Sequence, residues 1–124
     1  MPRANAATVL SFSKDKELLY LRGEVLKSAG FKVVNVLSVE AAIGELADSI
    51  DLVLIGHTVS YDEALTVAKS AKEFSNGRIG VIVIRKTLKP IQEEEIDEFI
   101  DSMAKPEELV NCVRAVVSRV SKRK

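Results

Sequence analysis

The chain has little of what disulfide-stabilised or membrane-spanning proteins need. Its 124 residues include a single cysteine, Cys112, so an internal disulfide is excluded and a reducing, cytoplasmic setting is the simpler expectation. No apolar run approaches the roughly 18 residues that a transmembrane helix requires. Residues 1–7 lack the long apolar core of a signal peptide. The sequence therefore predicts a soluble, cytoplasmic protein.

Neither sign of charge is in excess. Lysine and arginine total 18 residues, and aspartate and glutamate also total 18. A nucleic-acid-binding domain usually carries a basic excess, so we expect no nucleic-acid partner. Hydrophobic residues make up 47% of the chain, which is enough for one domain with its own core. We predict a single domain at residues 7–121 with flexible termini at 1–6 and 122–124.

Strand-like apolar segments alternate with helix-like segments along the chain. Strands are predicted at residues 7–12, 31–37, 51–56, 79–84 and 99–103. Helices are predicted at 16–29, 39–48, 60–74 and 106–121, with a possible short helix at 91–96. This alternation predicts βαβ units and a doubly wound parallel sheet of the α/β class.

Several residues mark the ends of the predicted helices. Ser38 is a predicted N-cap, and Ser60 with Glu63 forms a Ser-x-x-Glu capping box. Pro106 suits the first turn of the last helix, and Gly30 suits the left-handed position after the first.

The stretch from Asp51 to Ser60 is the first place to look for a site. Leu52 to Ile55 is a continuous apolar run, typical of a buried central strand. Ligands of open α/β sheets bind at the carboxyl ends of such strands. Gly56 and His57, the only histidine, therefore lie at the expected edge of any pocket, although Gly56 has no functional group.

Three stretches carry a resemblance to a known family. They are Val-Leu-Ser-Phe-Ser-Lys-Asp-Lys-Glu-Leu at 9–18, Asp-Leu-Val-Leu-Ile at 51–55, and Phe-Ile-Asp-Ser-Met-Ala-Lys-Pro-Glu-Glu-Leu at 99–109. With the order of elements, they resemble the receiver domain of two-component response regulators over about residues 7–120. The resemblance implies a flavodoxin-like, three-layer αβα sandwich with strand order 2-1-3-4-5. The short connection at 86–98 implies a shortened or remodelled fourth helix.

The residues that receivers use for phosphorylation are missing at the matching positions. Receivers phosphorylate an aspartate after the third strand, hold Mg²⁺ with an acidic pair, and bind the phosphoryl oxygens with a hydroxyl and a lysine. The acceptor position falls on Gly56, the acidic pair on Ser13 and Lys14, the hydroxyl on Arg85 and the lysine on Ser102. Asp15 would match a position of the acidic pair only if the alignment were shifted by one residue. The nearest lysine to the lysine position is Lys105, three residues beyond Ser102.

These replacements exclude the usual chemistry, because Mg²⁺ requires hard oxygen ligands and phosphoryl transfer requires a carboxylate nucleophile. The resemblance therefore implies a degenerate pseudo-receiver that lacks the phosphoacceptor aspartate. We expect no enzymatic activity, no catalytic residue, no metal and no cofactor.

Two basic residues suggest a different pocket. Lys14 and Arg85 follow strands that we expect to be adjacent, and with His57 they would make an anion site at the edge of the sheet. The alternatives are that both side chains point into solvent, or that one of them pairs with Asp15. His57 could be phosphorylated or act as an acid–base group, but it has no evident orienting partner. A polar loop residue at the end of a strand is therefore its simpler interpretation.

The sequence thus favours a protein-interaction or regulatory module in a two-component-type phosphorelay. We expect a protein partner, no membrane, and a monomer or weak homodimer. Docking is expected through the first and last helices or residues 86–98. The alternative is an anion or small-ligand sensor that uses Lys14 and Arg85. A nucleotide-binding enzyme is disfavoured, because the loop at 13–16 contains no glycine.

Overall fold

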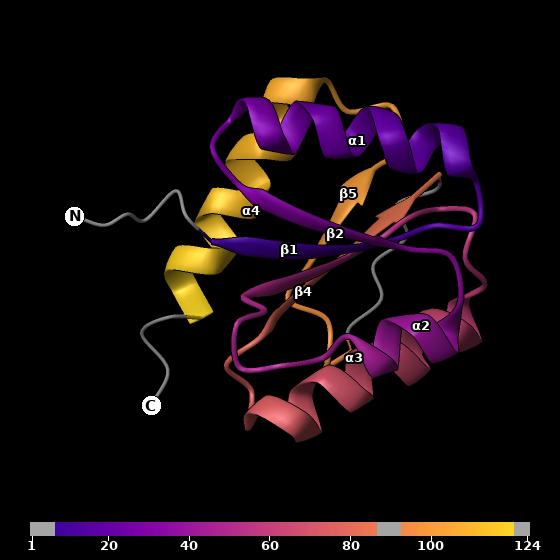
Figure 1. Ribbon diagram of the computed structural model, residues 1–124, viewed down its shortest axis with the longest axis vertical. Coiled ribbons are helices and arrows are strands. Elements are labelled where there is room, and N and C mark those ends of the chain that lie inside the picture. Colours follow the sequence, from indigo (N-terminus) through magenta and orange to yellow (C-terminus); the bar gives the residue numbers. More distant parts are fainter. Residues whose placement is uncertain (1–6, 87–92, 121–124) are drawn as a thin grey trace.

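Five parallel strands form one sheet at the centre of the molecule (Figure 1). The computed structural model describes residues 7–86 and 93–120. The strands are β1 (Thr8–Phe12), β2 (Lys32–Val36), β3 (Leu52–Ile55), β4 (Gly80–Arg85) and β5 (Glu98–Asp101). Their spatial order is β2-β1-β3-β4-β5, which confirms the predicted α/β class and strand order.

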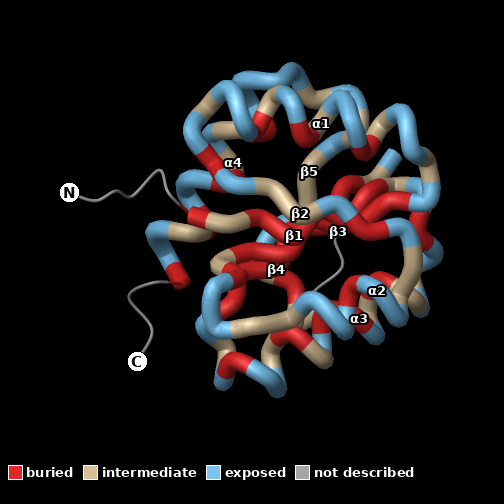
Figure 2. Tube along the Cα trace, in the orientation of Figure 1, coloured by how far each residue is buried: buried red, intermediate tan, exposed pale blue. Residues whose placement is uncertain are grey.

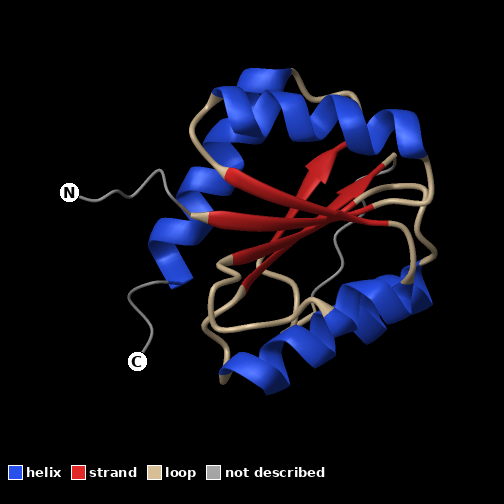
Figure 3. Cartoon of the chain, in the orientation of Figure 1, coloured by secondary structure: helices blue, strands red, loops and turns tan. Residues whose placement is uncertain are grey.

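Helices cover both faces of this sheet (Figure 3). One face carries α1 (Lys16–Ser28) and α4 (Pro106–Val120), and the other carries α2 (Val39–Gly44) and α3 (Tyr61–Ser75). None of the helices in the described ranges is long and apolar enough to cross a membrane. The arrangement is the predicted three-layer αβα sandwich.

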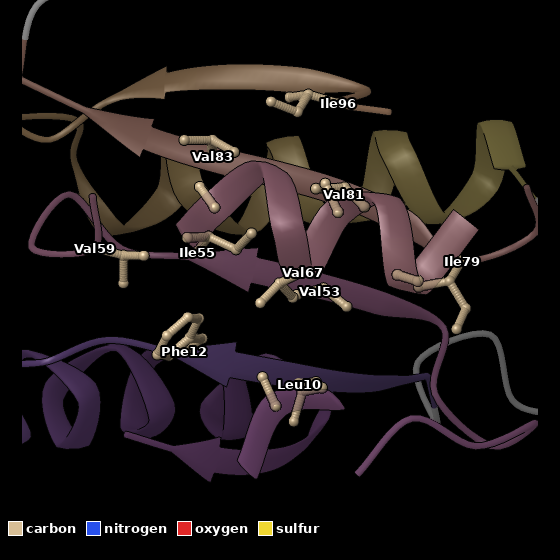
Figure 4. Close-up of a cluster of buried hydrophobic side chains, with 14 of the residues drawn as sticks. Leu10, Phe12, Val53, Ile55, Val59, Val67, Ile79, Val81, Val83 and Ile96 are labelled. Carbon is tan, nitrogen blue, oxygen red and sulfur yellow. The ribbon is translucent and has the colours of Figure 1, made fainter. Parts of the chain in front are cut away.

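Alternating side chains on the central strands build two cores. Leu10, Phe12, Val53 and Ile55 point toward α2 and α3, where they pack with residues such as Val67 (Figure 4). The intervening residues of the same strands face α1 and α4, and this second core includes Val9, Leu52, Leu54, Leu26 and Val113. Strands β3 and β4 are buried along nearly their whole length (Figure 2). Strands covered on both faces need apolar side chains throughout, which explains their continuous apolar runs.

The predicted capping residues are confirmed. Ser38 Oγ accepts a hydrogen bond from the backbone N–H of Ala41. Ser60 Oγ accepts from the backbone N–H of Glu63, as the N-cap of a capping box does, and also donates to the Glu63 carboxylate at 3.3 Å. Gly30 has a φ of 100°, a left-handed conformation that favours glycine.

One glycine in a strand has a packing reason. A Cβ atom on Gly80 would lie 2.7 Å from Cγ1 of Val116 on α4. The missing side chain therefore lets α4 approach the sheet closely. This close approach explains why a glycine stands in a strand that is otherwise made mostly of branched, apolar residues.

Two predicted elements end earlier than expected. The helix predicted at 39–48 ends at Gly44, because the backbone tightens into turns and the N–H of Leu46 bonds to the carbonyl of Ile43, three residues back. The strand predicted at 99–103 is β5, Glu98–Asp101. Asp101 Oδ1 accepts from the N–H of Met103 at 2.8 Å, and this local turn ends the strand. Met103 is accordingly 85% exposed.

The connection between β4 and β5 differs from the predicted short helix at 91–96. Residues 93–96 form a turn closed by a hydrogen bond from the N–H of Ile96 to the carbonyl of Glu93. The rest of that prediction, and most of the predicted loop at 86–90, lie outside the described residues. So do the predicted flexible termini and Ser121, the predicted end of the last helix.

Candidate functional site

The five positions that match the receiver pocket all lie at the carboxyl-terminal ends of strands. Ser13 and Lys14 follow β1, Gly56 follows β3, Arg85 ends β4 and Ser102 follows β5. Parallel pairing brings these strand ends together, and the N–H of Ser102 donates to the carbonyl of Arg85 at 2.8 Å. The parallel strands therefore end on the same side of the sheet, which is where these five positions lie.

Arg22 fills the space where an acceptor side chain would stand. A Cβ atom on Gly56 would lie only 2.8 Å from Nη1 of Arg22 and 3.3 Å from the Cβ of Ser13. Nη2 of Arg22 lies 3.3 Å from Nδ1 of His57. Burial lowers the pKa of the Arg22 guanidinium, and the negative charge of Asp15 partly offsets this effect. The cationic guanidinium of Arg22 thus lies directly beside Gly56 at the end of β3.

Direct hydrogen bonds join the two loops beside Gly56. Ser13 is fully buried, and its Oγ lies 3.0 Å from Oγ1 of Thr58. Thr58 Oγ1 also accepts from the backbone N–H of Lys14 at 3.0 Å, and Ser13 Oγ accepts from that of Asp15. The loop after β1 is therefore fastened to the loop after β3 without a bridging ion.

The carboxylate of Asp15 is committed to helix α1. Its Oδ1 accepts hydrogen bonds from the backbone N–H groups of Glu17 and Leu18, so Asp15 is the N-cap. The one-residue shift that would place Asp15 in a metal site does not occur. Within residues 7–86 and 93–120, no group of three His, Cys, Asp or Glu side chains is placed to hold a metal ion. The donor set does not fit the Mg²⁺ of a receiver.

Lys14 and Arg85 do not share a pocket in the way the sequence suggested. The strands that they follow are not adjacent, because β3 lies between β1 and β4. Lys14 Nζ pairs with Glu63 Oε2 at 3.1 Å, and this hydrogen bond lowers the pKa of Glu63. Lys14 is thus neutralised by Glu63, and Asp15, the partner considered from the sequence, caps α1 instead.

Arg85 lies between two aromatic rings. Its guanidinium carbon is 5.8 Å from the ring centre of Tyr61 and 5.4 Å from that of Phe99. The hydroxyl of Tyr61 donates to Oε2 of Glu93 at 2.8 Å. Burial and this hydrogen bond raise the pKa of Tyr61, which keeps the phenol protonated.

His57 has an orienting partner that the sequence did not reveal. Burial lowers the pKa of its imidazole, and the positive charges of Arg22 and Lys86 lower it further, against a smaller opposite effect of Asp15. Neutral imidazole accepts a hydrogen bond from Arg22 at Nδ1 and carries its proton on Nε2. The unfolded chain therefore takes up the second imidazole proton more readily than the folded protein does. The free energy of unfolding is expected to fall as the pH drops below 6.5, the ordinary pKa, toward the lower pKa of the folded state.

We expect Arg22→Gln to raise the pKa of His57 toward its ordinary value, because a positive charge and part of the covering side chain are removed. The single histidine makes the measurement direct, since one set of imidazole NMR signals is followed against pH. Arg114→Gln is the matched control, because Arg114 contacts Phe31 and the carbonyl of Ala29. An equal pKa in wild type and Arg22→Gln would contradict the assigned contact.

Sequence reasoning missed Arg22, Thr58 and Tyr61. A signal for Arg22 was present, since it stands three residues after Leu19 and four before Leu26, both of which α1 buries. A charged residue on such a stripe must find a polar site beside the core. Thr58 and Tyr61 gave no comparable signal, because their partners are 44 and 32 residues away.

Comparison with solved structures identifies the fold class. A CheY-like response regulator receiver domain protein from Methanospirillum hungatei matches with a TM-score of 0.76 and 15% identity, over 96% of this chain and 99% of that one. A response regulator receiver protein from Sinorhizobium medicae matches with a TM-score of 0.75 and 21% identity, over 93% and 97%. The signal receiver domain of an HD domain-containing protein from Pseudomonas fluorescens matches with a TM-score of 0.79 and 15% identity, over 93% and 97%.

These structures show that the chain has the CheY-like, flavodoxin-type fold of receiver domains. No protein-family model matches the sequence, and no curated protein matches it either. The similarity is therefore one of architecture, carried by the pattern of strands and helices at low sequence identity.

Proposed function

We propose that this domain is a pseudo-receiver that works in signalling by binding a protein partner without being phosphorylated. The observation that carries the proposal is the Arg22 guanidinium at Gly56. A receiver needs a carboxylate and a metal at this edge of the sheet. Here a cation and two hydrogen-bonded loops take their place, and we infer that the domain is no enzyme.

The internal contacts favour a fixed conformation over a switch. The Ser13–Thr58 contact and the Lys14–Glu63 ion pair both connect the loop after β1 with the region at the start of α3. These contacts form within the chain itself, so they do not depend on phosphorylation or on a bound ion. A surface presented by this fold would be available constitutively.

The first helix offers apolar area for such docking. Tyr20 is 61% exposed and Leu21 is 53% exposed, and both lie on α1. Helices α1 and α4 lie on the same face of the sheet (Figure 1), which supports the expected use of the first and last helices. Neighbouring exposed apolar side chains favour a protein contact over open solvent.

The test is capture of the partner from the native cell on immobilised protein, with and without acetyl phosphate and Mg²⁺. The same partner is expected in equal amount under both conditions. We expect the Tyr20→Ser, Leu21→Ser double variant to bind at least about tenfold more weakly, since anchoring apolar residues dominate interfaces.

Phe74→Ser is the matched control, because Phe74 is 49% exposed but lies on α3, on the opposite face of the sheet. Its capture is expected to equal that of wild type. Binding that requires acetyl phosphate, or capture that is unchanged in the double variant, would count against constitutive docking through α1.

A further inference from the structure

The guanidinium of Arg85 carries a donor that the protein does not use. Its Nη1 is buried and has no hydrogen-bond partner among the described residues. The aromatic rings of Tyr61 and Phe99 hold the group in place but accept no conventional hydrogen bond from it. Folded proteins rarely leave a buried polar atom unpaired, and such an exception calls for a ligand or another functional reason.

The side chain of Arg85 also lines a cavity, although Nη1 itself is buried and not exposed in it. The cavity has a volume of about 260 Å³. Two further lining residues can donate hydrogen bonds, namely Lys86, which is exposed, and His57, whose Nε2 carries the proton. Val59, Ala64 and Val83 supply apolar walls. The lining thus combines converging donors with a hydrocarbon surface, as small-ligand sites do.

The charges around the cavity favour an anion. Arg85 is a cationic side chain with no ion pair within the described part of the chain, and Lys86 adds a second positive charge. No Asp or Glu is among the described lining residues, and Glu93 accepts the hydrogen bond of Tyr61. Lys14 does not line the cavity, because it pairs with Glu63.

We propose that this cavity binds the carboxylate of a small organic acid. With its guanidinium turned into the cavity, Arg85 donates Nη1 to a carboxylate oxygen, which gives the unpaired donor its partner. His57 and Lys86 line the same cavity, and the apolar walls receive the hydrocarbon part. A free phosphate ion would leave those walls without a partner. The site would operate whether or not the domain docks to a protein.

Butyrate is the probe, and its binding is followed by NMR signals of the His57 imidazole and the Arg85 guanidinium. Saturable binding in the millimolar range is expected. Inorganic phosphate and uncharged butanol are each expected to bind at least about tenfold more weakly, since each lacks one half of the recognition. Bound carboxylate is also expected to raise the pKa of His57.

Arg85→Gln is expected to weaken butyrate binding at least about tenfold. Lys86→Gln, at an exposed position that places little demand on folding, is expected to weaken it by a smaller factor. Arg114→Gln is the matched control, since Arg114 also stacks on a ring, that of Phe31, outside the cavity, and it is expected to bind as wild type does. Absence of saturable binding, equal binding of phosphate, or unchanged affinity in Arg85→Gln would each overturn the proposal.

Discussion

Replacing Asp97 with alanine is expected to lower the free energy of unfolding by about 3–5 kcal/mol. Asp97 Oδ2 accepts hydrogen bonds from Lys72 Nζ at 2.6 Å and from the backbone N–H of Val81 at 2.8 Å. The side chain of Asp97 is 4% exposed and that of Lys72 is 13% exposed. Removing the carboxylate would leave the ammonium group of Lys72 largely buried without its counter-charge.

Glu98→Ala is the comparison that separates the effect of burial on stability from the effect of ion pairing alone. Glu98 pairs with Arg119 at 3.3 Å, but both side chains are nearly half exposed. Glu98→Ala is therefore expected to cost less than about 1 kcal/mol. The double variant Lys72→Met, Asp97→Leu is expected to be more stable than Asp97→Ala, because no unpaired charge remains. Urea denaturation measures all three, and similar costs for Asp97→Ala and Glu98→Ala would contradict this account.

Further hydrogen bonds of the same two residues fasten the start of β5. Lys72 on α3 donates to the carbonyl of Ile79 as well, and the N–H of Asp97 donates to the carbonyl of Val81. The start of β5 is thus fastened to both α3 and β4. These contacts join residues up to 25 positions apart, and no local pattern in the sequence announces them.

The architecture was predictable because it depends on local and periodic signals. Continuous apolar strands, the capping serines at 38 and 60, and Pro106 each report a local preference that the tertiary structure keeps. The two early ends, at Gly44 and Asp101, came from turn hydrogen bonds that apolar periodicity does not encode.

The candidate site was predictable in place but not in contacts. Strand ends fix where Ser13, Gly56 and Arg85 lie, and none of these three residues carries a carboxylate. The pairing of Lys14 with Glu63, and of Arg22 with His57, depends on side-chain directions across separate elements. These contacts engage Lys14 and Arg22 within the protein, so Lys14 and Arg85 do not form the shared basic pocket expected from the sequence.

No phosphoryl group is expected to transfer to this protein from acetyl phosphate and Mg²⁺. Gly56 offers no carboxylate, Arg22 occupies the adjacent space, and Asp15 is held by the N-terminus of α1. Gly56→Asp is expected to remain unmodified too, because its carboxylate would pair with Arg22 and the metal ligands would still be missing. We therefore expect no phosphorylated fraction in either protein.

Intact-protein mass spectrometry after this incubation is the most direct test, with a phosphorylatable receiver domain treated in parallel as the positive control. The account predicts unchanged masses for the wild type and Gly56→Asp, while the control gains the mass of one phosphoryl group. A stoichiometric, acid-labile phosphoryl adduct on the wild-type chain would contradict the claim that the receiver fold has been kept without its phosphorylation chemistry.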